Sequence, residues 1–289
     1  MVYFYLILQQ LIGSTTHLVA QDVTQSVDPG LLLLLRSLGA ASAFFVLLLF
    51  TERRWNVFSR IARKDIGRLV LLGLLNVPLN QLLYLYGIKY TTPENSALLY
   101  SLTPALVFLF TAIRHSERPS GKKALGIGLA LIGAVVVMFD QGAQFASKHT
   151  EGNILIFIAV IAWSLFTMLG RSVVLKYGAF YVTAVNMIFG ALLYLPFGLL
   201  TGHFSDVSGF SGISWTEVAY LILFASVLNY LLWYAALARL EATRVAVFQN
   251  LQPIITTAMA LYFGRAVLTL QFVGGGSLAL IGVLVVELA

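Results

Sequence analysis

Residues 129–133 read Leu-Ala-Leu-Ile-Gly, and residues 278–282 read Leu-Ala-Leu-Ile-Gly again. The two copies are 149 residues apart, and one ungapped shift of that size aligns further pairs: Ile12 with Ile161, Asn80 with Asn229, Pro104 with Pro253, Gly126 with Gly275 and Val136-Val137 with Val285-Val286. Shared apolar composition would explain scattered leucine matches, but it explains an identical pentapeptide with aligned proline and asparagine poorly. The chain therefore contains an internal repeat.

The composition places both copies in a membrane. Of 289 residues, 59% are hydrophobic and only 10% are charged, whereas soluble domains carry about 25% charged residues. A membrane-spanning helix needs about 20 apolar residues, and ten such runs are visible: 2–22, 29–50, 66–87, 94–113, 121–140, 152–172, 178–201, 214–237, 242–263 and 267–287. The runs are too long and too uniformly apolar for barrel strands. We expect an all-α integral membrane protein with ten transmembrane helices.

Basic residues predict the orientation of these helices. If the N-terminus is cytoplasmic, the inner loops hold fourteen Lys and Arg residues and the outer loops hold only Lys89, Lys148 and Arg265. This bias is the one that cytoplasmic loops carry, and it also accounts for the net charge of +6 without nucleic-acid binding. Both termini are then predicted to be cytoplasmic, in a bacterial inner membrane. The first run starts at once, with no basic segment and no cleavage site before it, so we interpret it as a span and not as a removable signal.

Five helices per copy is an odd number, so the second copy enters the membrane from the opposite side. The sequence therefore predicts two inverted five-helix repeats, residues 1–141 and residues 150–289. Inverted repeats are typical of secondary transporters, which bind their solute near the bilayer midplane at the repeat interface. The partners expected are a small-molecule solute and the lipid bilayer, in a monomer or a homodimer.

Polar residues inside the third and eighth runs indicate where such a site lies. Asn76, Asn80 and Tyr84 recur at spacing four and share a helical face, and the shift places Asn229 opposite Asn80 and Trp233 opposite Tyr84. Polar groups at membrane depth face a bundle interior or a cavity. We expect Asn80, Asn229, Tyr84, Trp233 and the neighbouring Gln81 to line a cavity; the alternative is hydrogen bonding between helices.

Four further residues are candidates for the same cavity. Trp163 lies about ten residues inside its run, which argues against the interfacial belt of tryptophans. Tyr100 and Gln249 are matched by the shift. His17 is the only histidine inside a run; we favour a hydrogen-bonded structural role for it over a role in the cavity or in proton transfer. At least one of Gln9 and Gln10 should also face inward.

Arg36 is a charge inside the second run, and such a charge needs a partner or a path to water. We expect a structural or gating ion pair, with Asp22 as a candidate partner; anion binding is the alternative. Pro104 and Pro253 each remove a backbone hydrogen bond, so matched kinks there are candidate hinges. Glycines in the fifth and tenth runs permit close packing, as in a scaffold or dimer face.

Several kinds of chemistry are excluded by what the sequence lacks. There are no cysteines, so disulfides, thiol nucleophiles and thiolate metal sites are ruled out. A single histidine cannot form a metal site, and we expect no cofactor. The acidic residues that we identified lie near the ends of the runs and not at midplane, so we expect facilitated diffusion, exchange or coupling without a buried acid. The motifs of hydrolases and metalloproteases are absent as well, which argues against an enzyme.

With these features in place, the chain resembles the drug/metabolite transporter (DMT) superfamily, in its ten-helix EamA branch. The resemblance covers nearly the whole chain and depends on the order and spacing of short motifs: Gly13-Ser14, Asp28-Pro29 with Arg36, Asn95-Ser96-Ala97, Thr103-Pro104 with Glu117, Trp163, and Gln252-Pro253. One departure is Arg265 after Gly264, where the family often has glutamate.

The resemblance implies export, or less often uptake, of small metabolites, as in YddG-type amino-acid exporters. An exporter of aromatic or hydrophobic amino acids is the first hypothesis, since the predicted cavity is aromatic and amide-lined. Nucleobases, nucleosides and amphipathic drugs are the alternatives. A lipid-modifying membrane enzyme and a scaffold without a substrate are less favoured.

Overall fold

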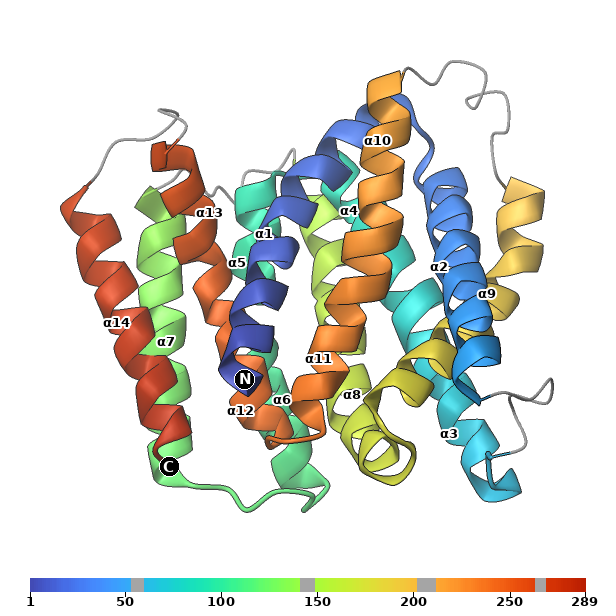
Figure 1. Cartoon of the computed structure of the whole chain (residues 1–289). Coiled ribbons are helices and arrows are strands. Elements are labelled where there is room, and N and C mark those ends of the chain that lie inside the picture. Colours follow the sequence, from blue (N-terminus) through green and yellow to red (C-terminus); the bar gives the residue numbers. More distant parts are fainter. Residues whose placement is uncertain (53–59, 141–148, 202–211, 263–268) are drawn as a thin grey trace.

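The structure is a computed structural model that describes residues 1–52, 60–140, 149–201, 212–262 and 269–289. Every regular element in these ranges is a helix (Figure 1). The helices of the first half are α1 (Val2–Ser26), α2 (Pro29–Glu52), α3 (Arg63–Leu74), the π-helix η1 (Leu75–Gln81), α4 (Leu82–Tyr90), α5 (Pro93–Tyr100), α6 (Thr103–Ile113) and α7 (Gly121–Asp140). The second half contains α8 (Thr150–Tyr177), α9 (Ala179–Thr201), α10 (Gly212–Tyr220), the π-helix η4 (Leu221–Leu228), α11 (Asn229–Leu237), α12 (Ala242–Val247), the 3₁₀ turn η5 (Phe248–Asn250), α13 (Leu251–Tyr262) and α14 (Leu270–Glu287).

Seven helical stretches in the described residues are long and apolar enough to cross a membrane: Pro29–Thr51, Arg63–Tyr90, Pro93–Ile113, Thr150–Tyr177, Ala179–Thr201, Trp215–Leu237 and Leu270–Glu287. The other three predicted spans correspond to α1, to α7 and to the broken pair α12–α13, which lie beside the seven in one bundle (Figure 1). The prediction of an all-α membrane fold is confirmed. Both termini lie at the same end of the bundle (Figure 1), as an even number of spans requires.

The two halves interrupt their helices at corresponding places. The third span contains η1 and the eighth contains η4, and a π-helical turn is a rare feature that often marks functional sites. The fourth span stops at Tyr100 and resumes at Thr103, with Pro104 in the first turn of α6. The ninth span passes through η5 before α13 starts at Leu251. The predicted breaks at Pro104 and Pro253 are therefore present in both halves.

Small residues join α7 and α14 into a close pair. A Cβ atom added to Gly133 would lie 2.4 Å from the backbone nitrogen of Ala279 and from the carbonyl oxygen of Gly275. One added to Gly126 would lie 2.8 Å from the carbonyl oxygen of Gly282. The 149-residue shift aligns Gly126 with Gly275 and Gly133 with Gly282. The contact of Gly126 with Gly282 is therefore the counterpart of the contact of Gly133 with Gly275. A pseudo-two-fold axis between the helices gives this reciprocal pattern. These glycines therefore let α7 and α14 of the same chain pack closely together.

The centre of the bundle is formed by spans from both halves. Helix α1 packs against α4 and α5 of its own half and against α11 and α13 of the other. Helix α8 packs against η1, α4 and α6 of the first half. The space between α1, η1, α8 and α11 is therefore shared by the two halves, and the polar residues converge there.

Candidate functional site

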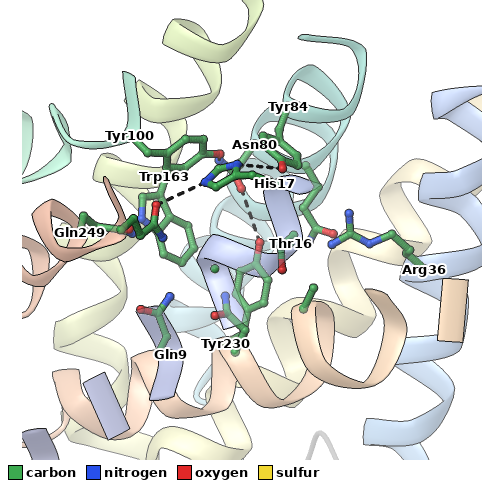
Figure 2. Close-up of a pocket in the computed structure, with 15 residues that line it drawn as sticks. Gln9, Thr16, His17, Arg36, Asn80, Tyr84, Tyr100, Trp163, Tyr230 and Gln249 are labelled. Atoms are coloured by element: carbon green, nitrogen blue, oxygen red, sulfur yellow. Dashed lines mark hydrogen bonds between the residues drawn. The ribbon is translucent and has the colours of Figure 1, made fainter. Parts of the chain in front are cut away.

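A cavity lies in this shared space (Figure 2). Its volume is about 70 Å³, and residues of both halves line it: Gln9, Gly13, Thr16, His17, Arg36, Asn80, Gln81, Tyr84, Tyr100, Trp163, Ala225, Asn229, Tyr230, Gln249 and Gln252. Ligand pockets for drug-sized molecules have volumes of roughly 300 Å³ or more. The cavity must therefore widen before it can hold a solute of that size.

Asn80 is the centre of a hydrogen-bond network on one wall. Its amide nitrogen donates to the hydroxyl of Tyr100, at 2.8 Å, and to the carbonyl oxygen of Ala159, at 2.9 Å. The hydroxyl of Tyr230 donates to its amide oxygen at 3.5 Å. Asn80 lies in η1 and Ala159 in α8, so the asparagine both lines the cavity and bonds the two halves together. The two interpretations of Asn80 that the sequence left open both apply.

His17 joins α1 to this wall. Its Nδ1 is 3.0 Å from the hydroxyl of Tyr84 and 3.1 Å from that of Ser96, and its Nε2 is 3.3 Å from the amide oxygen of Gln252. The ring also lies near that of Tyr100, with centroids 5.7 Å apart. The histidine is thus hydrogen-bonded, as expected, and it lines the cavity at the same time (Figure 2).

Aromatic rings form another part of the cavity lining. Trp163 meets Tyr230 edge to face, with ring centroids 5.5 Å apart, and stacks on Phe166 at 5.4 Å. Such arrangements fix ring positions, so the wall presents a rigid flat surface. Trp163 is 3% exposed, and its indole Nε1 has no hydrogen-bond partner among the described residues.

Unpartnered polar atoms gather around the cavity. Besides the indole Nε1 of Trp163, the lining residues Gln81, Asn229 and Gln249 each keep a buried amide oxygen without a partner, and Arg36 keeps Nη1, within the described part of the chain. A buried polar group left without a hydrogen bond costs about 1–3 kcal/mol. Donors and acceptors left free in one place are what a polar solute would satisfy.

One residue that was expected to line the cavity, and one that was expected to share a face with the lining residues, lie elsewhere. Trp233 does not line the cavity: it is fully buried behind Trp163, with ring centroids 5.1 Å apart, and its Nε1 donates to Thr167 Oγ1 at 3.1 Å. Asn76 turns away as well, because its amide nitrogen donates to the amide oxygen of Asn186 at 3.0 Å. Both residues bond neighbouring helices.

The predicted ion pair of Arg36 with Asp22 is also wrong. The guanidinium donates from Nε and Nη2 to Ser226 Oγ, at 3.3 and 3.1 Å, and it points from α2 toward the cavity (Figure 2). Asp22 lies nearer one end of the bundle, where it lines a second, wider opening together with Glu217 of α10. A carboxylate is absent from the lining of the central cavity in the described residues.

Tyr230, Thr16, Gln9 and Gln252 line the cavity as well. Tyr230 could have been found from the repeat, since the 149-residue shift pairs it with Gln81. Gln252 was part of the quoted motifs and Gln9 was one of two inward candidates. Nothing in the sequence predicted that Thr16 lines the cavity, apart from its position one residue before His17.

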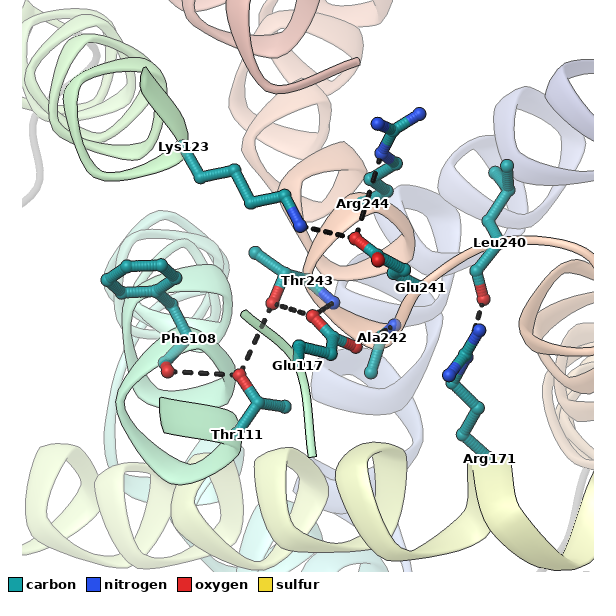
Figure 3. Close-up of polar contacts among 10 residues, drawn as sticks. All are labelled: Phe108, Thr111, Glu117, Lys123, Arg171, Leu240, Glu241, Ala242, Thr243 and Arg244. Carbon is teal, nitrogen blue, oxygen red and sulfur yellow. Dashed lines mark hydrogen bonds and ion pairs between the residues drawn. The ribbon is translucent and has the colours of Figure 1, made fainter. Parts of the chain in front are cut away.

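At the end of the bundle that holds both termini, polar contacts connect the two halves (Figure 3). The carboxylate of Glu117 accepts hydrogen bonds from the backbone nitrogen of Ala242, at 2.6 Å, and from Thr243 Oγ1, at 2.6 Å, so it caps α12. Lys123 of α7 pairs with Glu241. We call Glu117, Lys123, Glu241 and Thr243 the termini-end clamp. Gly264 and Arg265, where the family motif differs, lie outside the described residues.

The fold and the cavity define a class: a helical membrane protein with a cavity between its two halves that is lined by polar and aromatic side chains. Among the described residues, no group of His, Asp or Glu is arranged to hold a metal ion.

Comparison with known proteins identifies the family. The sequence matches the EamA-like transporter family twice, over residues 1–139 and over residues 150–288. The chain belongs to this family, and it is a membrane transporter.

Relatives extend over most of the chain. The uncharacterized transporter YyaM of Bacillus subtilis is 29% identical over 248 residues, which cover 85% of this chain and 80% of that protein. An uncharacterized transporter of Archaeoglobus fulgidus is 29% identical over 213 residues, covering 72% of this chain and 73% of its own. One solved crystal structure superposes with a TM-score of 0.75 at 21% identity, over 97% of this chain and 96% of its own. This last similarity concerns the fold.

Proposed function

We propose that the chain is a secondary transporter that moves a small neutral or zwitterionic metabolite through the central cavity, and that aromatic or hydrophobic amino acids are its substrates. In this proposal the chain is an exporter similar to those of the YddG type. It performs no covalent chemistry and holds no cofactor.

The observation that carries the proposal is the convergence of free polar atoms and aromatic rings in one buried cavity. Trp163 and Arg36 offer unpartnered N–H donors, while Gln81, Asn229 and Gln249 offer unpartnered oxygens. An amino acid brings a carboxylate for the donors and an ammonium group for the oxygens. Its apolar side chain would lie against the ring wall of Trp163 and Tyr230.

A nucleobase or nucleoside is the second candidate. Its planar ring would stack on the aromatic wall, and its donor and acceptor edges would pair with the amides of Asn229 and Gln249. The two candidates differ in charge, because a nucleoside carries no carboxylate.

The proposed mechanism is alternating access between the two inverted halves, residues 1–141 and residues 150–289. The helix breaks at Pro104 and Pro253 would serve as hinges, because each interrupts the backbone hydrogen bonds of its span. The termini-end clamp would close the cytoplasmic side in this state, while the opening lined by Asp22 and Glu217 lies at the other end. Both termini are then cytoplasmic, and the bacterial inner membrane is the proposed location.

An efflux screen tests the substrate class. Cells that express the chain are loaded with radiolabelled amino acids and nucleosides, and the rate of loss is compared with that of cells carrying an empty vector. Trp163→Phe keeps a ring in the wall but removes the unpartnered Nε1 donor. One hydrogen bond is worth about 0.5–1.5 kcal/mol, so the apparent affinity for the exported solute should fall about two- to tenfold.

Trp215→Phe is the matched control, since Trp215 is 45% exposed at the far end of α10, and it should transport like wild type. If no amino acid or nucleoside leaves faster than from vector cells, the proposal is wrong. If Trp163→Phe transports like wild type, the cavity is not where the solute binds.

A further inference from the structure

Arg36 is the only charged side chain that lines the central cavity in the described part of the chain. It is 3% exposed. Moving a cation out of water costs several kcal/mol unless an anion compensates for it. A buried guanidinium therefore needs a reason to be where it is.

Within the described residues, no ion pair neutralises this charge. None of the ion pairs of the described residues includes Arg36. One hydroxyl, Ser226 Oγ, accepts from Nε and Nη2. Nη1 has no hydrogen-bond partner among the described residues.

Arg36 lines the cavity, and its Nη1 is left without a partner among the described residues. Ser226 holds the Nε–Nη2 edge in place, and Figure 2 shows the group extending from α2 toward Tyr230 and the labelled lining residues. An arginine fixed on one edge and open on another presents N–H donors in a planar fork that matches a carboxylate.

We infer that Arg36 binds the anionic group of the transported solute, and that this group is a carboxylate. The inference depends on the proposed transport function and narrows it: a solute with a carboxylate is favoured, and an uncharged nucleoside is not. The indole Nε1 of Trp163 is a second donor on the cavity wall, and the free oxygens of Gln81, Asn229 and Gln249 remain for any N–H groups of the solute. A free phosphate group would place two negative charges against one cation, which the cavity does not balance.

Three probes of equal size separate charge from shape. Benzoate, benzamide and benzylamine are an anion, a neutral molecule and a cation at pH 7, and each carries one phenyl ring. The full chain is reconstituted in nanodiscs, and the binding of each probe is measured from the shift of its melting temperature. We expect wild type to bind benzoate about ten- to a hundredfold more tightly than benzamide, since a hydrogen bond to a charged group accounts for a factor of that size.

Variants of Arg36 test the assignment. Arg36→Gln should lose the preference for benzoate and keep its affinity for benzamide, while Arg36→Lys, which keeps the charge but loses the fork, should retain part of the preference. Lys122→Gln removes one exposed positive charge at the start of α7 and should behave like wild type. Without any probe, Arg36→Gln should melt at a higher temperature than wild type, because it removes an uncompensated buried charge.

Two results would overturn the inference. If wild type binds benzoate and benzamide equally and Arg36→Gln changes neither, then Arg36 is not the anion-binding group, although binding in the cavity and the proposed transport would stand. If Arg36→Gln melts at a lower temperature without probe, the arginine has a structural role. The transport proposal is tested separately: it is wrong if the efflux screen detects no export of any solute.

Discussion

Glu241 shows how a single residue of the termini-end clamp responds to its surroundings. Partial burial raises the pKa of this carboxyl group, but the hydrogen bond from Lys123 and the positive charges of Lys123, Arg244 and Arg171 outweigh it, so the net pKa lies below the ordinary value. The carboxylate form is therefore stabilised by folding. Such a group adds stability above its unfolded pKa, about 4.3 for glutamate, and that stability is lost as the pH falls through the lowered folded pKa.

The sign of this shift predicts a pH dependence. Glu241→Gln removes the carboxylate, so its melting temperature should be lower than that of wild type by a constant amount from pH 8 to about pH 5.5. The difference should shrink as the pH falls below about 4, where wild type also loses the charge. Thermal unfolding of both proteins in the same detergent across this range measures it.

Glu151→Gln is the control for this experiment, since Glu151 is exposed in the first turn of α8 and forms none of the ion pairs of the described residues. Its difference from wild type should be small at every pH. A Glu241→Gln difference that stays the same down to pH 3.5 would show that the ion pair with Lys123 does not stabilise the fold.

The cavity residues show what residue-level reasoning could and could not predict. The repeat correctly led from Asn80 to Asn229, because both follow from sequence identity at matched positions. It failed at Trp233, although Asn229 and Trp233 both lie in the regular helix α11. The π-helical turn ends at Gln81 in the first half but at Leu228 in the second, which is earlier than the 149-residue shift requires. The wider turn changes which residues face inward, so that Tyr230 lines the cavity.

Arg36 was misassigned for a different reason. A buried charge predicts a partner, but the sequence does not show which residue is near in space. Asp22 is close to Arg36 along the chain, yet it lies at the second opening. Arg36 instead contacts Ser226 of η4. This contact depends on how the two halves pack together, and no local sequence pattern predicts that packing.

At the scale of helices, the α7–α14 pair depends on the absence of side chains at a few positions. Without a strong hydrophobic driving force between helices in lipid, close backbone approach provides the attraction. A Cβ atom at Gly133 would lie 2.4 Å from backbone atoms of α14, so the helices would have to move apart.

Two glycines of α7 provide a matched test. Gly133→Ala should destabilise the protein by about 1–3 kcal/mol, as overpacking of a tight contact does. Gly128→Ala, in the same helix, would place its Cβ in open space with nothing within 4 Å, and should be neutral or slightly stabilising. Unfolding in a denaturing detergent titration compares the two. Equal loss of stability in both variants would contradict the packing account, as would no loss in Gly133→Ala.

The helix breaks were predictable from sequence because proline acts locally. Pro104 and Pro253 each lie where a span is interrupted, and the interruptions put Tyr100 and Gln249 at the cavity in corresponding positions. The π-helical turn in the eighth span was not predictable, since η4 contains no proline.

For the whole molecule, the repeat is the feature that unites sequence, fold and site. The apolar runs predicted an all-helical membrane bundle, and the repeat predicted paired features in its two halves. The reciprocal contacts of Gly126 with Gly282 and of Gly133 with Gly275 have the symmetry that the repeat requires. The two halves contribute different groups to the cavity: the first half supplies Arg36 and His17, and the second supplies the rings of Trp163 and Tyr230.

The central claim is that the cavity between the two halves is the place where the solute binds. Because the chain contains no cysteine, a single introduced thiol can be labelled without background. Ala225→Cys places one in the cavity lining, and Ala40→Cys places a control in α2, where the side chain is fully buried and does not line the cavity.

The decisive measurement is the rate at which a small membrane-impermeant thiol reagent modifies Ala225→Cys, with and without the solute identified by the efflux screen. The account predicts that the thiol is modified, that saturating solute slows the modification at least tenfold, and that Ala40→Cys reacts slowly in both conditions. Modification of Ala225→Cys at the same rate with and without solute would contradict it.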